Sequence, residues 1–395
     1  MNMESISYII DTLYAIFAMT LIIFMVPGFA MLEAGIVRTK NVTSVLTINT
    51  LIYSVASLSF LLFGYSLAFG DMASATMSKY AAFLFQMAFV GKVVNIMSGG
   101  VSERAKILPL SLFTVIMASF LYPLIVNITW GSNFLKGTIL ELSMYDLAGS
   151  TIIHSTGGWA LLAAILIIGA RKGRYTKEGA IRVIPASNIP LVTLGAFLLW
   201  IGWFGFNGGS VGSIASKENA DAVALTILNT NTSGLCGAIM VAIIMQIMYK
   251  KLDLTMILNG ALGGLVAVTA GANLYDIYTP ILIGSIGGGL VVISVQLFDK
   301  LKLDDPVGAL SVHLVNGMWG TIAVGIFASN GDNITMTGQL KGIFIVAIFA
   351  FFSSYIVLYL INKIMPLRAG NDEEMQGLDV EECGLEAYPE FKRAF

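Results

Sequence analysis

The sequence predicts an all-α membrane protein. Of its 395 residues, 56% are hydrophobic and only 12% are charged, whereas a soluble domain carries about 25% charged residues. The apolar residues form continuous runs that are long enough to cross a bilayer as helices, which excludes a barrel. This composition also argues against a soluble enzyme, a nucleic-acid-binding protein and a disordered chain. The net charge of −2 gives no information about partners.

We expect eleven transmembrane helices. The apolar runs that predict them lie at 8–32, 44–69, 79–100, 107–130, 147–170, 188–208, 220–249, 254–272, 277–298, 307–329 and 340–366. The first run is too long for the apolar core of a cleavable signal peptide, and no positively charged segment precedes it. An odd number of spans puts the two ends of the chain on opposite sides of the membrane.

The distribution of lysine and arginine predicts the orientation. The odd-numbered loops and the C-terminal tail hold 17 of these residues, and the alternate loops hold four, namely Lys79, Lys136, Lys217 and Lys341. Because positive charge collects on the cytoplasmic side, we expect the N-terminus outside, the C-terminus in the cytoplasm, and the chain in the cytoplasmic membrane. The two cysteines, Cys236 and Cys383, predict neither a disulfide nor a metal site, and we expect no cofactor.

One motif occurs twice. In both copies an aspartate (Asp146, Asp305) is followed by a glycine three residues later and a histidine (His154, His313) eight residues later. The first copy opens the fifth run and the second opens the tenth. Because five helices separate them, the copies cross the membrane in opposite directions, as in the inverted repeats of many transporters.

The repeat also predicts the domain organisation. Residues 1–366 form one transmembrane domain, with pseudo-symmetric halves at about 8–170 and 188–329 and an extra helix at 340–366. Residues 367–395 remain as a cytoplasmic C-terminal tail, for which the family resemblance given below implies a regulatory role.

The geometry of the repeat brings the only two histidines of the chain together. Each aspartate caps the start of a helix. Eight helical residues span about 12 Å, and half of the hydrocarbon core is about 15 Å thick. His154 descends from the outside and His313 rises from the cytoplasm, so both rings reach the middle of the membrane.

Two imidazoles at this depth indicate a functional site. In contact, they can line a path for a small polar molecule or relay a proton. The alternatives are a pair that only joins two helices and a bis-histidine haem site. Two histidines are too few ligands for a catalytic metal. Ser155 and Ser210 show no sign of an activated nucleophile, so we expect no enzyme activity.

Aromatic residues add a further signal. Phe85 and Phe89 are four residues apart in the third run, and Phe204 and Phe206 end the sixth run. Trp130 ends the fourth run on the outside, where its π-face could attract a small cation. The alternatives are an interfacial aromatic belt for Trp130 and core packing for the phenylalanines.

Together these residues resemble the ammonium transporter superfamily (Amt/Mep/Rh), and most closely its Amt branch of bacteria and archaea. The resemblance covers essentially the whole chain, and its motifs keep their order. They lie at 27–28, 33–42, 85–89, 103–104, 146–154, 201–210, 304–313 and 377–388.

The resemblance implies a role for each matching residue. Trp130 and Ser210, with Phe85, match an outer site that recruits ammonium, and Asp146 matches a carboxylate that supports this site without touching the substrate. The remaining matches are Phe89 and Phe206 for a stacked phenyl gate, His154 and His313 for a twin-histidine pore, and Trp203 and Thr269 for the lining of the path.

The resemblance implies ammonium transport, with methylammonium as an analogue. Ammonium and potassium are of similar size, but only ammonium donates hydrogen bonds and can release a proton. A dry gate and a narrow apolar pore impose a high desolvation cost on any ion. We therefore expect ammonium to be recruited, deprotonated near the gate and passed as ammonia, while the proton moves separately along the histidines.

The tail resembles the ending of the same family. Gly377, Asp379 and Tyr388 are its matching residues, and Cys383 stands where histidine is usual. The resemblance implies a homotrimer in which the tail lies along a neighbouring subunit, and a cytoplasmic PII-type regulator (GlnK) as partner. An alternative is an ammonium sensor with the same fold and little or no flux. Such members usually carry a signalling domain after the last span, whereas 29 residues follow Pro366, which favours a transporter. A carbon dioxide or water pore of the Rh kind would not need the cation site.

Two further positions depart from the family pattern. Glu33 ends the first run where many relatives have an aromatic residue. Lys92 lies about one turn below Phe89, where an apolar or small residue is usual. If Lys92 faces the pore, its charge would repel ammonium. If it faces a helix interface, Glu33 or a backbone carbonyl could satisfy it.

Overall fold

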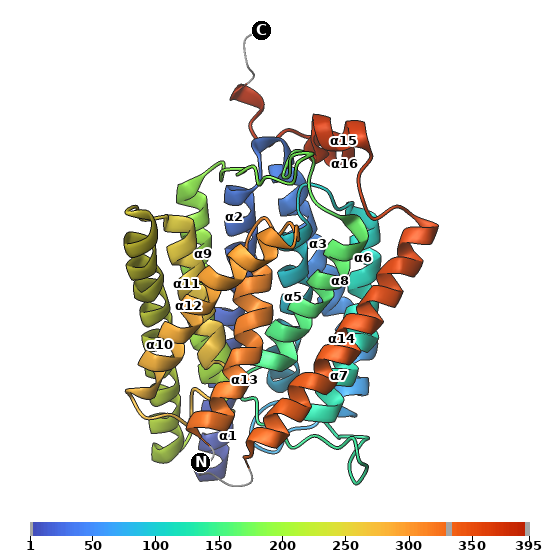
Figure 1. The fold of residues 1–395 in the computed structure, drawn as a ribbon. Coiled ribbons are helices and arrows are strands. Elements are labelled where there is room, and N and C mark those ends of the chain that lie inside the picture. The colour runs from blue at the N-terminus through green and yellow to red at the C-terminus, as the bar shows by residue number, and fades with distance from the viewer. Residues whose placement is uncertain (1–2, 329–333, 392–395) are drawn as a thin grey trace.

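The structure is a computed structural model that describes residues 3–328 and 334–391. It is a bundle of helices (Figure 1), and these two ranges contain no β-strand. Residue 329 of the tenth predicted run and residues 392–395 of the predicted tail lie outside the described residues. The elements of the first half are α1 (Met3–Ile23), α2 (Met25–Ile36), η1 (Thr39–Asn41), α3 (Val42–Ser59), η2 (Phe60–Gly64), α4 (Tyr65–Phe69), α5 (Lys79–Val101), α6 (Ile107–Ile116), η3 (Met117–Leu121), α7 (Tyr122–Thr129), η4 (Ser150–Ser155) and α8 (Thr156–Ile168).

The second half begins with the sixth predicted span, and short helices in the tail follow its last long helix. Its elements are α9 (Ile189–Gly209), α10 (Lys217–Tyr249), α11 (Leu254–Val268), α12 (Thr279–Lys300), η5 (Leu310–Val315), α13 (Asn316–Phe327), α14 (Met336–Ile364), α15 (Asn371–Gln376), α16 (Leu378–Cys383) and η6 (Pro389–Phe391). The start of α1 lies at one end of the bundle, and α15 and α16 lie at the other (Figure 1). We call these the N-terminal end and the tail end.

The prediction of an all-α membrane protein is confirmed. Ten helical segments of the described residues are long and apolar enough to cross a membrane. The eighth predicted span, 254–272, differs: α11 has only 15 residues and ends at Val268. The helix stops because later backbone groups are bound elsewhere. The carbonyl of Ala270 accepts from the Leu147 N–H, and the carbonyl of Ala272 accepts from the Asn229 amide.

The two histidine-bearing spans start later than predicted and begin with a π-helical turn rather than an α-helical one. The turn η4 contains His154, and η5 contains His313. The Asp146 carboxylate accepts hydrogen bonds from four successive backbone N–H groups, those of residues 149–152, at 2.8–3.1 Å. Asp305 accepts from the N–H groups of Gly308 and Leu310. Each aspartate therefore caps its helix as the sequence predicts.

The two copies of the motif run in opposite directions in the bundle (Figure 1). The residues just after α8 contact the residues just before η5, because Arg171 bonds to both carboxylate oxygens of Asp304 at 2.8 and 2.9 Å. The end of one repeat thus lies beside the start of the other.

Glycines bring α9 close to the first two helices. A Cβ atom on Gly195, Gly202 or Gly205 would lie 2.2–2.4 Å from the backbone or side chains of α1 and α2. Small residues permit such close helix contacts within a membrane. The glycines occupy one face of α9, and Trp203 and Phe206 are buried beside them in the interior of the bundle.

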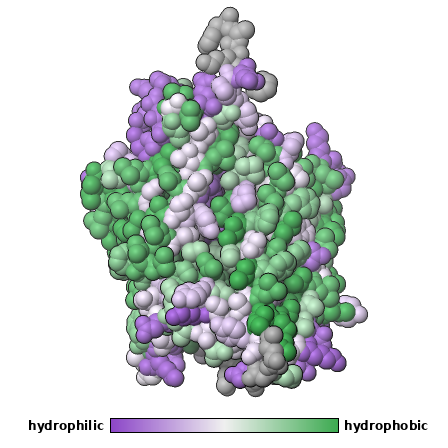
Figure 2. Space-filling view, turned by 180° about the vertical axis from the view of Figure 1, so that it is seen from behind, coloured by the Kyte–Doolittle hydropathy of each residue, from purple (hydrophilic) through white to green (hydrophobic). Residues whose placement is uncertain are grey.

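The surface has the polarity of a membrane-embedded bundle. Figure 2 shows a broad hydrophobic band around the middle of one face, with hydrophilic residues concentrated at both ends. Large side chains such as Phe197, Ile239 and Phe344 are more than half exposed on α9, α10 and α14, as lipid-facing residues would be.

An ion cluster, buried except for the partly exposed Arg38, joins the loops at the tail end. It consists of Arg38, Glu103, Arg171 and Asp304, in which Glu103 accepts from Arg38 and, at 2.6 Å, from Arg171. Burial alone would raise the pKa of Asp304, but the Arg171 hydrogen bonds and the charges of Arg104 and Arg171 outweigh it and lower the pKa to about 2. The cluster thus fixes the loop before η5.

Breaking the cluster should destabilise the fold. Asp304→Asn leaves Arg171 without its bidentate partner, and we expect a loss of about 3–5 kcal/mol, as for other broken buried pairs. The matched change Asp299→Asn removes the partly exposed partner of Arg174 and should cost less than about 1 kcal/mol. Thermal unfolding in detergent measures both, and equal losses would contradict the role of the cluster.

The same variant has a predicted pH signature. Because the folded-state pKa of Asp304 lies below its ordinary value of 3.8, its contribution to stability is complete above about pH 4 and disappears as the pH falls through about 2. The decrease in unfolding temperature across this window should be smaller in Asp304→Asn than in the wild type. An identical decrease would show that Asp304 contributes nothing.

Candidate functional site

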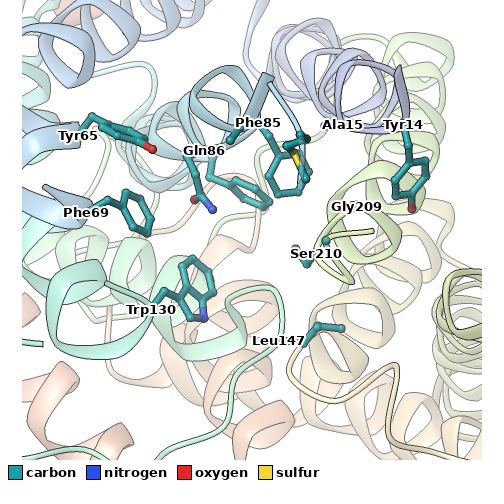
Figure 3. A pocket seen from close by; sticks show the side chains of 14 residues that line it. Tyr14, Ala15, Tyr65, Phe69, Phe85, Gln86, Trp130, Leu147, Gly209 and Ser210 are labelled. Atoms are coloured by element: carbon teal, nitrogen blue, oxygen red, sulfur yellow. The ribbon is translucent and has the colours of Figure 1, made fainter. Parts of the chain in front are cut away.

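A pocket of about 300 Å³ opens at the N-terminal end of the bundle. Figure 3 shows Trp130 facing Phe85 and Gln86 across this pocket, with Ser210 and Leu147 on the remaining side. The structure therefore places three predicted residues, Trp130, Ser210 and Phe85, in one cavity. Gln86 is an additional polar group there, which the sequence analysis did not single out.

Hydrogen bonds fix the polar residues of this outer pocket. The Trp130 indole Nε1 donates to the backbone carbonyl of Asp146 at 2.7 Å, which orients the ring. The Ser210 hydroxyl donates to the carbonyl of Phe206 at 2.8 Å. The lone pairs of the Ser210 oxygen therefore remain free to accept a hydrogen bond from a bound molecule. Asp146 is not among the lining residues, because its carboxylate is used in the cap of η4.

A series of aromatic rings connects the pocket to the centre of the bundle. Phe85 contacts Phe89 at a centroid distance of 4.9 Å, and Phe89 contacts Phe206 at 4.5 Å. Phe206 in turn stacks on His154 at 5.4 Å. The phenyl pair Phe89–Phe206 is arranged edge to face, at 69°, rather than stacked as the sequence analysis expected. Edge-to-face contact is a favoured geometry of aromatic pairs, and it closes the floor of the pocket.

The two histidines meet in the interior. His154 Nδ1 and His313 Nδ1 are 3.2 Å apart, and the rings are nearly parallel, at 19°. His154 Nε2 is buried and has no hydrogen-bond partner among the described residues. A buried nitrogen without a partner is costly, so this atom is available to a small molecule that donates or accepts a hydrogen bond.

The contact between the two Nδ1 atoms restricts their protonation. One ring must donate from Nδ1 and the other must accept, so only one of the two facing nitrogens carries a proton. In the neutral pair, the donor ring then has an acceptor at Nε2, and the acceptor ring has a donor at Nε2. The pair therefore offers one donor and one acceptor, and a proton that crosses it exchanges these roles.

Trp203 and Thr269 support His154. The Trp203 ring stacks on His154 at 5.2 Å and 20°. Its Nε1 donates to the Thr269 hydroxyl at 2.9 Å, and this hydroxyl donates to the carbonyl of Leu265. Both residues are fully buried. They position the ring, and neither lines the outer pocket or the small cavity beside His313.

A second, small cavity lies on the tail side of His313. Its volume is about 20 Å³, which is room for about one water-sized molecule. The polar residues that line it are Glu33, Asn95, Asn259 and His313. The sequence analysis recognised Glu33 only as a departure and missed the two asparagines. The available signal was that polar amides in an apolar span are costly unless they bind something.

Lys92 does not face either cavity. Its side chain is buried, and its ammonium nitrogen lies 5.9 Å from the centre of the Tyr53 ring. Within the described part of the chain this nitrogen has no hydrogen-bond partner, so neither Glu33 nor a backbone carbonyl satisfies it. The Tyr53 ring on α3 offers this nitrogen a cation–π contact.

The three predicted tail residues lie against the tail-end loops of the same chain. Asp379 accepts from the N–H of Ser44 at 2.8 Å. Gly377 has a φ of +118°, and a Cβ there would lie 2.6 Å from the carbonyl of Lys40, so only glycine fits. Tyr388 packs on the buried cluster that includes Val37. These contacts hold the tail against the tail end of its own chain.

Across residues 3–328 and 334–391 no group of three histidine, cysteine or acidic side chains is placed to hold a metal ion. Cys236 in α10 and Cys383 in α16 are free thiols, and the Cys383 sulfur lies 3.6 Å from the Thr47 hydroxyl.

Comparison with known proteins identifies a family and a fold. The family model described as the Ammonium Transporter Family matches residues 13–388. Ammonium transporter Amt2 of Archaeoglobus fulgidus is 33% identical, over 97% of this chain and 89% of that protein. Ammonium transporter 3 of Dictyostelium discoideum is 30% identical, over 97% of this chain and 95% of that protein.

Solved structures have the same fold. A structure titled a sensor Amt protein matches with a TM-score of 0.89 and 32% identity, covering 96% of this chain and all of that chain. Mep2 of Candida albicans matches with a TM-score of 0.84 and 26% identity, covering 98% of this chain and 92% of that chain.

The Asp146 cap should control the local stability of η4. Asp146→Ala removes the acceptor for four N–H groups, so amide exchange at residues 149–152 should accelerate. The matched variant Asp276→Ala removes the acceptor for Tyr278 and Thr279 and should change exchange only at the start of α12. Hydrogen–deuterium exchange by mass spectrometry measures both. Unchanged protection of residues 149–152 in Asp146→Ala would contradict the capping role.

Proposed function

This chain belongs to the Ammonium Transporter Family, and we propose that it carries ammonium as ammonia and a separately moved proton. The observation that carries the proposal is the histidine pair, which lies at the end of a series of rings between an outer pocket and an inner cavity. The relatives named above are transporters by name, and ammonium is the corresponding substrate.

Recruitment takes place in the outer pocket. The Trp130 and Phe85 rings offer negative π-faces to a small cation, and the Ser210 oxygen and the Gln86 amide offer hydrogen-bond acceptors. These side chains line one cavity. Ammonium fits this set because it has both a charge and four N–H donors.

Deprotonation follows at the phenyl gate. Phe89 and Phe206 are buried and in contact. For ammonium or ammonia to pass, the two rings must move and the passing molecule must lose its hydration water. This step is far more costly for an ion than for neutral ammonia. Potassium cannot lose its charge, and the gate therefore discriminates by chemistry rather than by size.

The histidine pair accepts ammonia and relays the proton. Ammonia can donate to one imidazole nitrogen and accept from the next, which replaces the contacts it loses in leaving water. A proton that enters at His154 and crosses the Nδ1–Nδ1 contact to His313 exchanges the tautomers of the pair. The net movement of one charge makes transport electrogenic.

Orientation and assembly complete the proposal. The N-terminal end faces the outside and the tail end faces the cytoplasm, in the cytoplasmic membrane. The active unit is a homotrimer, and a PII-type regulator of the GlnK kind acts at the tail end. Two hydrogen bonds support the action of a regulator at this end. Lys40 and Lys172 donate to backbone carbonyls of the tail, so a protein that moves the tail also moves the loops that carry these lysines. In the proposed trimer the tail, besides contacting its own subunit, also lies along a neighbouring subunit, as the family resemblance implies.

An ammonium sensor is the second candidate function. One solved structure with high similarity is titled a sensor Amt protein, and a sensor needs the outer pocket but no flux. Lys92 on α5 lies three residues from Phe89, and its buried nitrogen has no hydrogen-bond partner among the described residues. When protonated, this nitrogen would oppose the passage of a cation.

The two candidates differ in their electrical response. On a solid-supported membrane, wild-type proteoliposomes given an ammonium pulse should produce a current that persists and decays with filling of the liposomes, because the charge crosses the membrane. A brief charge displacement whose decay time does not change with the lipid-to-protein ratio would mean binding without transport. That result would favour the sensor.

The histidine pair should be required for selective conduction. His154→Ala removes one ring of the relay, and we expect the sustained ammonium current to fall by at least about tenfold. The control Cys236→Ser changes a half-buried thiol on α10, away from both cavities, and should conduct like the wild type. A His154→Ala variant that carries methylammonium and ammonium at full rate and with full selectivity over potassium would overturn the mechanism.

A further inference from the structure

We propose that Glu33 is the proton acceptor on the cytoplasmic side of the histidine pair, and that the small cavity beside it is where ammonia regains its proton. This inference rests on the proposed function. The proposed function leaves the proton on His313 without a next acceptor, because neither the aromatic residues nor the histidines themselves can take it. Glu33 supplies that acceptor.

The first support is the shape of the small cavity. Glu33 from α2 and His313 from η5 line the same space, which has room for about one water-sized molecule. An ammonia or water molecule in this space would therefore have both residues in its lining and could bridge them. A proton transfer needs the donor and the acceptor within hydrogen-bond reach directly or through one such molecule.

The second support is the state of the Glu33 side chain. It is 1% exposed, and among the described residues it has no ion-pair partner. Its carboxylate accepts from the Asn49 amide at 3.0 Å and from the Ser98 hydroxyl at 3.2 Å. These two bonds orient the carboxylate and leave further lone pairs unused.

The third support is the access to the carboxylate. Gly99 lines the cavity beside Glu33, and a Cβ placed on Gly99 would lie 3.2 Å from the Glu33 Oε1 atom. Because glycine has no side chain, this oxygen stays open to the cavity. The Asn95 Oδ1 atom is buried and has no partner among the described residues, so it is a second acceptor for a new ammonium ion.

The other titratable groups around Glu33 do not compete for this role. His313 is the only other ionisable residue of the cavity lining. On α5, Lys92 is seven residues from Gly99, about two turns, and its nitrogen lies against Tyr53. From α3 and α11 the polar neighbours are the neutral side chains of Asn49 and Asn259.

The proton balance is complete. A proton passes from the His313 imidazolium to a Glu33 carboxylate oxygen, which forms a neutral carboxylic acid and leaves a neutral imidazole. The lone pair of an arriving ammonia then takes this proton, so an O–H bond breaks and an N–H bond forms. Ammonium leaves toward the cytoplasm, and Glu33 is again a carboxylate.

A purely structural role of Glu33, as a link between α2, α3 and α5, makes a different prediction. The variants that separate the roles are Glu33→Gln, which keeps the size and a hydrogen-bonding oxygen but cannot accept a proton, and Glu33→Asp, which keeps the carboxylate. Asp11→Asn is the matched control. Like Glu33, Asp11 is a buried carboxylate that accepts hydrogen bonds, three in its case, but it lies near the other end of the bundle.

The test measures sustained ammonium currents of proteoliposomes whose lumen, on the cytoplasmic side of the protein, is buffered at different pH values. In the wild type the current should fall as the luminal pH falls, because a protonated Glu33 cannot accept. Glu33→Gln should reduce the current by at least about tenfold, and the remainder should not depend on luminal pH. Glu33→Asp should restore a pH-dependent current, and Asp11→Asn should keep the pH dependence of the wild type.

The outcomes separate this inference from the proposed function. If the wild type gives only a transient charge displacement, ammonium transport itself is wrong. If the wild type conducts and Glu33→Gln conducts with the same luminal pH dependence, the acceptor role of Glu33 is overturned. A loss of current in Glu33→Gln and Glu33→Asp alike, with lowered unfolding temperatures in both, would assign Glu33 a structural role and would also overturn it.

Discussion

The hydrogen bond between two imidazole rings in the interior of the bundle is the interaction on which the rest of the structure depends. A 3.2 Å contact between two Nδ1 atoms allows only one proton between them. The rings meet because two helices enter from opposite ends, each capped by an aspartate at its start. If either start shifted along its axis, the rings would miss each other.

The surrounding structure holds this contact against the cost of burying polar groups. Trp203 stacks on His154 and is itself fixed by Thr269. The ion cluster at the tail end fixes the loop before η5 through Asp304. The Phe89 and Phe206 rings are in contact between the outer pocket and His154, and in the proposed mechanism these apolar rings make an ion pay a higher desolvation cost than a neutral molecule. An apolar centre and a pocket with polar groups at its entrance are the two features on which the proposed path for ammonia depends.

Much of this arrangement could be predicted from the sequence, because it follows from periodicity and from repetition. The lengths of the apolar runs gave the helices, and the repeated spacing from aspartate to histidine predicted the caps and the meeting of His154 with His313. The rest depends on contacts between distant segments. The early end of α11 requires the backbone bonds of Ala270 and Ala272 to other elements. The direction of Lys92 and the cavity that joins Glu33 to His313 depend on the rotation of helices about their axes, which a pattern of apolar residues along a nearly all-apolar span leaves undetermined.

The most direct test of the central claim uses the fact that the chain has only two histidines. Labelling with nitrogen-15 histidine in lipid bilayers makes both rings visible by solid-state NMR with no other imidazole signals. The account predicts one protonated and one unprotonated Nδ1 at neutral pH, with a nitrogen–nitrogen correlation across the pair. Two protonated Nδ1 atoms, or two rings without any correlation between them, would contradict it.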